Sequence, residues 1–161
     1  MKKTKYTSLI AMSCICVLSL ILLLCVTVYG KREVHLPFEP PPFDENAIAG
    51  VPEVPTELFW RKQVIGEYAV SLCGKPTIAG QAMDVWLTNP SESDVWMKVR
   101  ILDIEGNLLG ETGLIRPGEY VRSVFLQTVP DVGSDIEMKI MMYERDTYYS
   151  AGAASFYTTV D

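Results

Sequence analysis

Histidine and cysteine, the residues most often used for nucleophilic catalysis and zinc binding, are scarce in this 161-residue sequence. The single histidine, His35, lies in a proline-rich stretch where no substrate cleft is expected, so a serine or cysteine nucleophile would lack its general base. Cys73 is the only cysteine beyond residue 25. One histidine and one distant cysteine, His35 and Cys73, are too few to supply the usual ligands of a zinc site. Because Cys73 follows the apolar run YAVSL, we expect a buried strand residue rather than a reactive thiol.

Carboxylates are the remaining groups that could act chemically. Asp103 and Glu105 lie at a predicted EGN turn, where solvated side chains are expected, whereas a glycosidase needs two carboxyl groups facing one bond. Asp131, Asp135 and Glu137 are close together in PDVGSDIE, and Ca²⁺ prefers such oxygen ligands. Their spacing matches no EF-hand loop, so a polar strand connection is the favoured interpretation. We therefore expect no catalytic residue, no metal site and no cofactor.

Aromatic side chains give the clearest signal of a binding surface, because Tyr and Trp combine apolar area with a polar group. Trp96 falls on the charged side of its predicted strand, and Trp86 is exposed or buried according to the parity of its strand. Tyr148 and Tyr149 fall in a predicted turn, a common place for recognition. The alternative for Trp96 is that neighbouring side-chain stems or the segment LFWRKQ cover it.

The residues that must position these side chains form short β-like runs separated by turn signals. The seven predicted strands are 66–73, 81–89, 95–104, 108–115, 120–128, 135–145 and 153–160. Apolar residues alternate with polar ones most clearly in 95–101 and 136–141, which indicates strands with one buried and one solvated face. The sequence therefore predicts an all-β fold, a single antiparallel two-sheet β-sandwich without a disulfide, over residues 57–161.

The run LTNPSESDVWMKVRILDIEGNLLGETGLIRPGEYVRSVFL resembles the middle of immunoglobulin-like or fibronectin-III-like modules of bacterial surface proteins. Asn89-Pro90 precedes the long strand 95–104, and the turn Pro117-Gly118 introduces a strand with spaced apolar residues. The similarity covers roughly residues 80–145 and lacks the Cys–Trp–Cys arrangement of antibody domains. It implies a disulfide-free adhesin, spacer or binding unit and no specific ligand.

The N-terminal part of the chain reads as a membrane anchor. Residues 8–29 are uncharged and apolar, which is long enough for a transmembrane helix. No clean small-residue pattern marks a cleavage site, so we predict an uncleaved anchor, with a cleaved signal peptide as the alternative. Residues 1–7, with three lysines, are predicted to be a short cytoplasmic tail, and the proline-rich residues 30–56 an extracellular stalk.

Charge and sequon content narrow the functional classes. The chain has a net charge of −6, and all its acidic residues follow the predicted span, which argues against nucleic acid as a partner. The absence of an N-x-[ST] sequon favours a bacterial surface protein. The sequence thus predicts a non-enzymatic, single-pass binding or structural module in the cell membrane, with its C-terminal domain outside. Its partner would be another protein or an envelope polymer. The alternatives are an accessory subunit of a secretion or conjugation system and, less favoured, an envelope hydrolase.

Overall fold

The computed structural model describes residues 12, 15–24 and 38–161. Residues 15–24 are helical, and no helix within the described ranges has the length and apolar character needed to cross a membrane. The predicted tail 1–7, much of the predicted span 8–29 and the first part of the predicted stalk lie outside the described residues. The chain divides into two compact units, Met1–Glu39 and Pro40–Asp161, and every strand formed by the described residues lies in the second.

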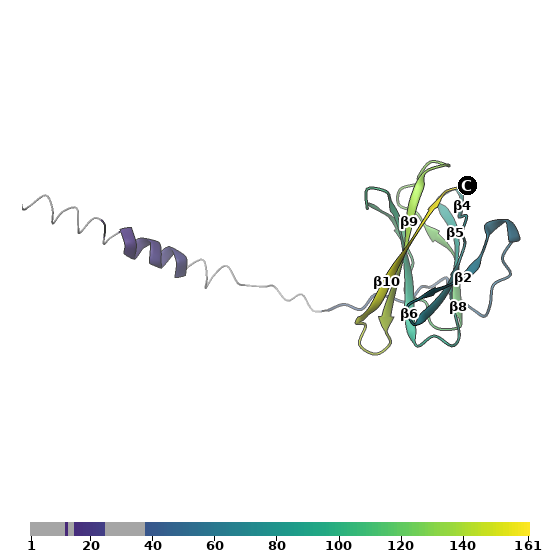
Figure 1. Cartoon of the computed structure of the whole chain (residues 1–161), viewed down its shortest axis with the longest axis horizontal. Helices are drawn as coiled ribbons and strands as arrows, with labels where there is room; N and C mark the ends of the chain where they lie inside the picture. The colour runs from purple at the N-terminus through teal and green to yellow at the C-terminus, as the bar shows by residue number, and fades with distance from the viewer. Residues whose placement is uncertain (1–11, 13–14, 25–37) are drawn as a thin grey trace, which may run out of the picture. The chain divides into compact units, whose positions relative to one another are not determined.

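Two antiparallel sheets make up the second unit (Figure 1). Their strands are β1 (Ile48–Ala49), β2 (Arg61–Ile65), β3 (Tyr68–Leu72), β4 (Thr77–Ala79), β5 (Ala82–Asn89), β6 (Val95–Asp103), β7 (Leu108–Glu111), β8 (Glu119–Phe125), β9 (Asp135–Glu144) and β10 (Ser150–Thr159). A single 3₁₀ turn, Thr56–Leu58, precedes β2. All seven predicted strands are present, and the prediction of an all-β fold with two antiparallel sheets is confirmed. The short strands β1, β2 and β4 were missed.

The first sheet has the order β1-β8-β5-β3-β2, with β4 also pairing with β5, and the second has the order β10-β9-β6-β7. In the second sheet, β6 pairs with β9 along the whole length of β6, and β9 pairs with β10 from Asp135 to Tyr143. Strands β2 and β10 each end their sheet, so both have one side without a strand partner among the described residues.

Alternate residues of both sheets share one core. Val99 and Ile101 of β6 and Ile140 of β9 are at most 1% exposed, as their period-two pattern predicted. They belong to the same apolar cluster as Met83 and Val124 of the first sheet. The two sheets therefore pack face to face, and burial of this cluster is the main source of their stability.

The folded unit begins earlier than the sequence predicted. Residues 30–56 were assigned to a stalk, but the compact unit starts at Pro40. The Asp44 amide donates to the Leu114 carbonyl (2.9 Å), and an Asp44 carboxylate oxygen accepts from the Gly113 amide (2.8 Å). Strand β1 then pairs with the edge of β8. Proline excludes a helix or a central strand, but it permits docking against a sheet edge.

Candidate functional site

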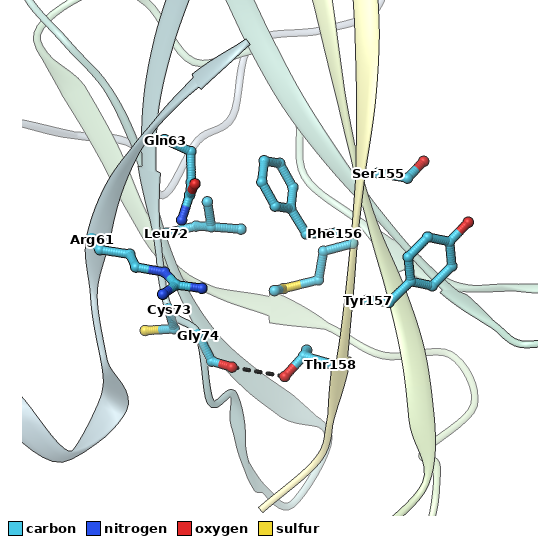
Figure 2. Close-up of a pocket in the computed structure, with 10 residues that line it drawn as sticks. Arg61, Gln63, Leu72, Cys73, Gly74, Ser155, Phe156, Tyr157 and Thr158 are labelled. Carbon is cyan, nitrogen blue, oxygen red and sulfur yellow. Dashed lines mark hydrogen bonds between the residues drawn. The ribbon is translucent and has the colours of Figure 1, made fainter.

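A cleft of about 310 Å³ lies where β2 and β10, the end strands of the two sheets, border the open side of the sandwich (Figure 2). Leu72, Met138 and Phe156 supply apolar surface to this cleft. In Figure 2 the Phe156 side chain points into the cleft, whereas Ser155 and Tyr157 point to the other side of β10. This alternation follows from the strand geometry, in which successive side chains lie on opposite faces.

Strand β2 contributes two polar side chains to the lining of the cleft. The side chains of Arg61 and Gln63 extend from this strand toward Phe156 (Figure 2). Arg61 is exposed and makes no ion pair with any carboxylate of the part of the chain that the structure describes. The cleft therefore offers an apolar surface beside an available cation. One end is held closed by the Thr158 hydroxyl, which donates to the Gly74 carbonyl across the sandwich (2.7 Å).

Cys73 lies at the base of this cleft, and its thiol is chemically inert. The residue is fully buried, as predicted, and its amide donates to the Val85 carbonyl (2.9 Å). Burial, with a further contribution from the Asp84 carboxylate, raises the pKa of the Cys73 thiol to about 12. A thiol with that pKa is protonated at physiological pH, and the thiolate is the nucleophilic form. Cys73 thus serves packing.

Strand β10 is the least protected edge of the two sheets. Strand β1 has two residues. Strand β7 has four residues, and its Gly110 forms an antiparallel bridge with Leu126. Strand β2 carries Arg61 and Lys62, and edge charges of this kind discourage pairing with other strands. The ten residues of β10 include no charged residue and no proline. A long neutral edge presents unpaired backbone donors and acceptors to another strand.

The aromatic residues predicted to bind do not form one surface. Trp96 of β6 is half-buried between Phe43 (ring centroids 4.9 Å apart) and Tyr148 (4.8 Å). The Arg116 guanidinium lies over the Phe43 ring, 3.7 Å from its centroid. The structure thus brings Trp96 and Tyr148 together. The cover over Trp96 comes from the N-terminal segment and the β9–β10 turn, not from the segment LFWRKQ.

Trp86 lies in the other sheet. A bulge in β5 gives Trp86 a φ of 48°, which is unusual for a residue other than glycine. Its ring stacks on Tyr120 (6.1 Å, 19°), and its carbonyl accepts a hydrogen bond from the Trp60 indole (3.0 Å). Tyr149 stays 71% exposed in the β9–β10 turn, so it alone of the four predicted residues presents most of its surface to solvent.

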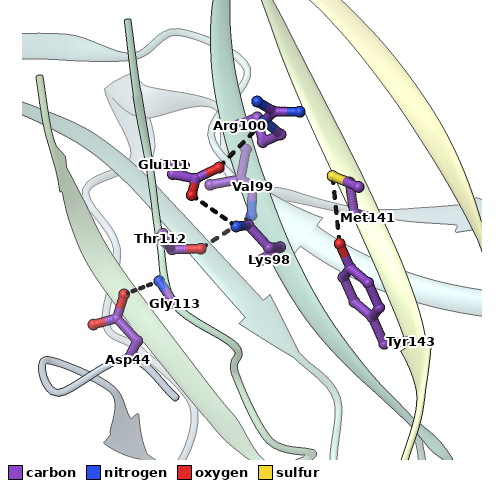
Figure 3. Close-up of polar contacts among 9 residues, drawn as sticks. All are labelled: Asp44, Lys98, Val99, Arg100, Glu111, Thr112, Gly113, Met141 and Tyr143. Atoms are coloured by element: carbon purple, nitrogen blue, oxygen red, sulfur yellow. Dashed lines mark hydrogen bonds and ion pairs between the residues drawn. The ribbon is translucent and has the colours of Figure 1, made fainter. Parts of the chain in front are cut away.

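A charged cluster on the outer face of the second sheet was not foreseen (Figure 3). The Glu111 carboxylate of β7 forms ion pairs with two cations of β6, Lys98 (Nζ–Oε1, 3.0 Å) and Arg100 (Nε–Oε2, 3.2 Å). The Lys98 side chain is only 9% exposed. Burial and the Glu111 carboxylate raise the pKa of the nearby Tyr143 hydroxyl, against an opposing effect of Arg100. The alternation along the strand predicted that Lys98 and Arg100 share a face, but it did not predict that the Glu111 carboxylate pairs with both.

Three of the acidic residues considered for catalysis or calcium binding, Asp103, Asp135 and Glu137, accept hydrogen bonds from nearby groups. Asp103 accepts hydrogen bonds from the Asn107 side chain and backbone, and these bonds lower the pKa of its carboxyl. Asp135 accepts from Thr159 (2.8 Å), and Glu137 accepts from Ser155. No group of three His, Cys, Asp or Glu side chains within residues 12, 15–24 and 38–161 could hold a metal ion.

No protein-family model and no curated protein sequence matches the chain. Among solved structures, the β-glucuronidase from Ruminococcus gnavus in complex with uronic isofagomine is similar at a TM-score of 0.38 and 19% identity. The same enzyme in complex with D-glucuronic acid gives the same values. The match covers 56% of this chain and 15% of the enzyme. A similarity at this level supports no statement about activity, and the chain corresponds to a small part of the enzyme's length.

Proposed function

We propose that this protein is a non-enzymatic, single-pass membrane-anchored module of the bacterial cell envelope that binds another protein through the open edge of its sandwich. The single observation that carries the proposal is the neutral ten-residue edge strand β10, which borders an apolar cleft. Its fold would be a disulfide-free, immunoglobulin-like or fibronectin-III-like sandwich.

The open edge suits recognition of an extended protein segment. In strand addition, main-chain hydrogen bonds supply affinity, and pockets for alternate side chains supply specificity. Strand β10 offers the backbone groups, and the cleft with Phe156 and Arg61 offers a place for side chains of the added segment. The exposed aromatic Tyr157 adds contact area on the outer side of the strand.

The chemistry of the described residues favours binding over catalysis. The Cys73 thiol is buried with its pKa raised to about 12, so it cannot act as a nucleophile at neutral pH. Asp103 is committed to its turn through hydrogen bonds that lower its pKa. A hydrolase would need a base with a reachable substrate position, and these groups do not supply one.

The membrane anchor and the orientation rest on the apolar, uncharged residues 8–29 and on the lysines before them. Alkaline carbonate extraction of membranes tests the anchor, since an integral protein stays in the pellet. Protease added to intact cells or spheroplasts tests the orientation, because an external domain is degraded while the short tail is protected. Release by carbonate would contradict the anchor.

Site-specific photocross-linking in cells that make the full-length protein tests the binding edge. A photoreactive amino acid in place of Tyr157 should yield protein adducts. The same amino acid in place of Val132, which is similarly exposed (76% against 75%) but lies in a loop outside the strands, should not. Equal adduct formation at both positions, or none at position 157, would contradict binding at β10.

A further inference from the structure

We infer that the protein bound at β10 is a second copy of this chain, and that the two β10 strands pair antiparallel about a two-fold axis at Ser155. This inference rests on the proposed function, because it names the partner for the same edge. Pairing would join the two four-stranded sheets into one continuous sheet. Three features support it: the order of side-chain sizes along β10, the absence of charge on this strand, and the fact that a two-fold pair covers the β10 edge of both copies.

Strand β10 is divided by side-chain size into two halves that complement each other. Ser150–Ala154 contains only Ser, Ala and Gly, whereas Phe156–Thr159 contains two aromatic and two β-branched residues. An antiparallel pair centred on Ser155 places Phe156 opposite Ala154 of the second copy. By the same rule Tyr157 faces Ala153, and Thr158 faces Gly152. Each large side chain therefore meets a small one, as close packing across a strand pair requires.

The register at Ser155 also keeps the pair within the regular part of the strand. The pairing of β10 with β9 is irregular between Ser150 and Gly152, and it is uninterrupted from Gly152 to Thr159. A two-fold axis at Ser155 overlaps residues 152–158 with themselves, which excludes that irregularity. A shift of one residue along the strand would place side chains of opposite faces across from one another.

Charge and symmetry favour a second copy over an unrelated strand. Because β10 carries no charged residue, two copies can approach without like charges facing each other across the pair. A two-fold pair uses the same patch on both chains and is closed, so neither copy keeps an open β10 edge. Among the other strands that end a sheet, β1 is short, β7 is bridged to Leu126 and β2 carries charges. A single contact between two copies would therefore cover the long, neutral edge that is left.

Cysteine cross-linking tests both the partner and the register in the full-length protein. The background carries Cys14→Ala, Cys16→Ala and Cys25→Ala, so that the cysteines of the predicted anchor cannot react. In that background Ser155→Cys should give a covalent dimer with a short bismaleimide, because the two Cβ atoms would be about 5 Å apart. Thr159→Cys on the same exposed face should not, since its two copies would be about 27 Å apart.

A second measurement does not depend on cross-linking. Sedimentation of the full-length protein in detergent micelles should show a dimer, and Ser155→Lys should raise its dissociation constant roughly tenfold, because two ammonium groups would meet at the axis. Val132→Lys adds the same charge at a loop position and should leave the dimer intact. Both positions are exposed, so neither substitution disturbs the core.

The outcomes separate this inference from the function on which it rests. Dimers of Ser155→Cys without dimers of Thr159→Cys support the two-fold pair, as does loss of the dimer in Ser155→Lys alone. Equal cross-linking of both cysteine variants, or a monomer at all concentrations, overturns it. If the photoreactive group at Tyr157 captures a different protein, the second copy is excluded while binding at β10 stands. If it captures nothing, the proposed function falls as well.

Discussion

Replacing Glu111 with glutamine would leave the ammonium group of Lys98 buried without its carboxylate. The Lys98 side chain is 9% exposed, and its Nζ lies 3.0 Å from the Glu111 carboxylate. Breaking a fully buried ion pair costs about 3–5 kcal/mol, because an uncompensated charge is left in a medium of low polarity. Glu111 itself is 38% exposed, so water partly screens the pair. We therefore expect Glu111→Gln to lower the free energy of unfolding by about 1–3 kcal/mol.

Thermal unfolding of the full-length protein in detergent, followed by circular dichroism, measures this loss. For a folded unit of this size the expected decrease in Tm is about 4–12 °C. The matched control is Glu92→Gln, which removes an ion pair to Lys62 whose side chains are 55% and 64% exposed, and it should leave Tm unchanged. The double variant Lys98→Met, Glu111→Gln should recover most of the loss, because it removes the buried charge as well. A wild-type Tm for Glu111→Gln would contradict a stabilising role of the ion pair. A double variant that is no more stable than the single one would show that the unpaired Lys98 charge is not the cause of the loss.

Two further predictions concern Cys73 and Gly113. Because the pKa of the buried Cys73 thiol is raised from 9.0 to about 12, its contribution to stability is complete below pH 9 and is lost as the pH rises toward 12. Urea unfolding should therefore show a decrease of up to about 1.4 kcal/mol per pH unit above pH 9 that Cys73→Ala lacks; parallel profiles would contradict it. The same thiol should react with maleimide at pH 7 only after unfolding. Gly113→Ala should destabilise by about 1–3 kcal/mol and expose residues 40–56 to protease, because its Cβ would lie 2.5 Å from the Asp44 amide nitrogen; an unchanged Tm would show that the segment shifts freely.

The strands of the core could be predicted from the sequence because their signal is local. Alternation of apolar and polar residues has the period of the strand itself, so Val99, Ile101 and Ile140 identified their buried face without any knowledge of their neighbours. The apolar run before Cys73 and the usual burial of free cysteines identified that residue as buried. The alternation missed β2, whose residues are exposed or half-buried throughout, because a strand at the end of a sheet has no buried face to impose alternation.

Contacts between distant segments were decided by the tertiary structure. Nothing near Trp96 in the sequence indicates that Phe43 and Tyr148 cover it, since these residues are far apart in the chain and meet only after both sheets have formed. Likewise, the prolines before residue 57 suggested a stalk, whereas Asp44 and Gly113 dock part of that segment on the folded unit. A composition rich in proline determines the local backbone, but not what the backbone lies against.

The candidate binding edge shows the same division. The sequence alone shows that Ser150–Thr159 contains no charged residue and no proline, and that its small residues precede its large ones. Whether such a strand is central and safely paired or terminal and open depends on the order of the strands, which places β10 beside β9 and leaves its other side without a strand. The residues thus determined the neutral character of this strand and the order of its side-chain sizes. The strand order, set by long-range pairing and by the shared core, determined that it is an edge.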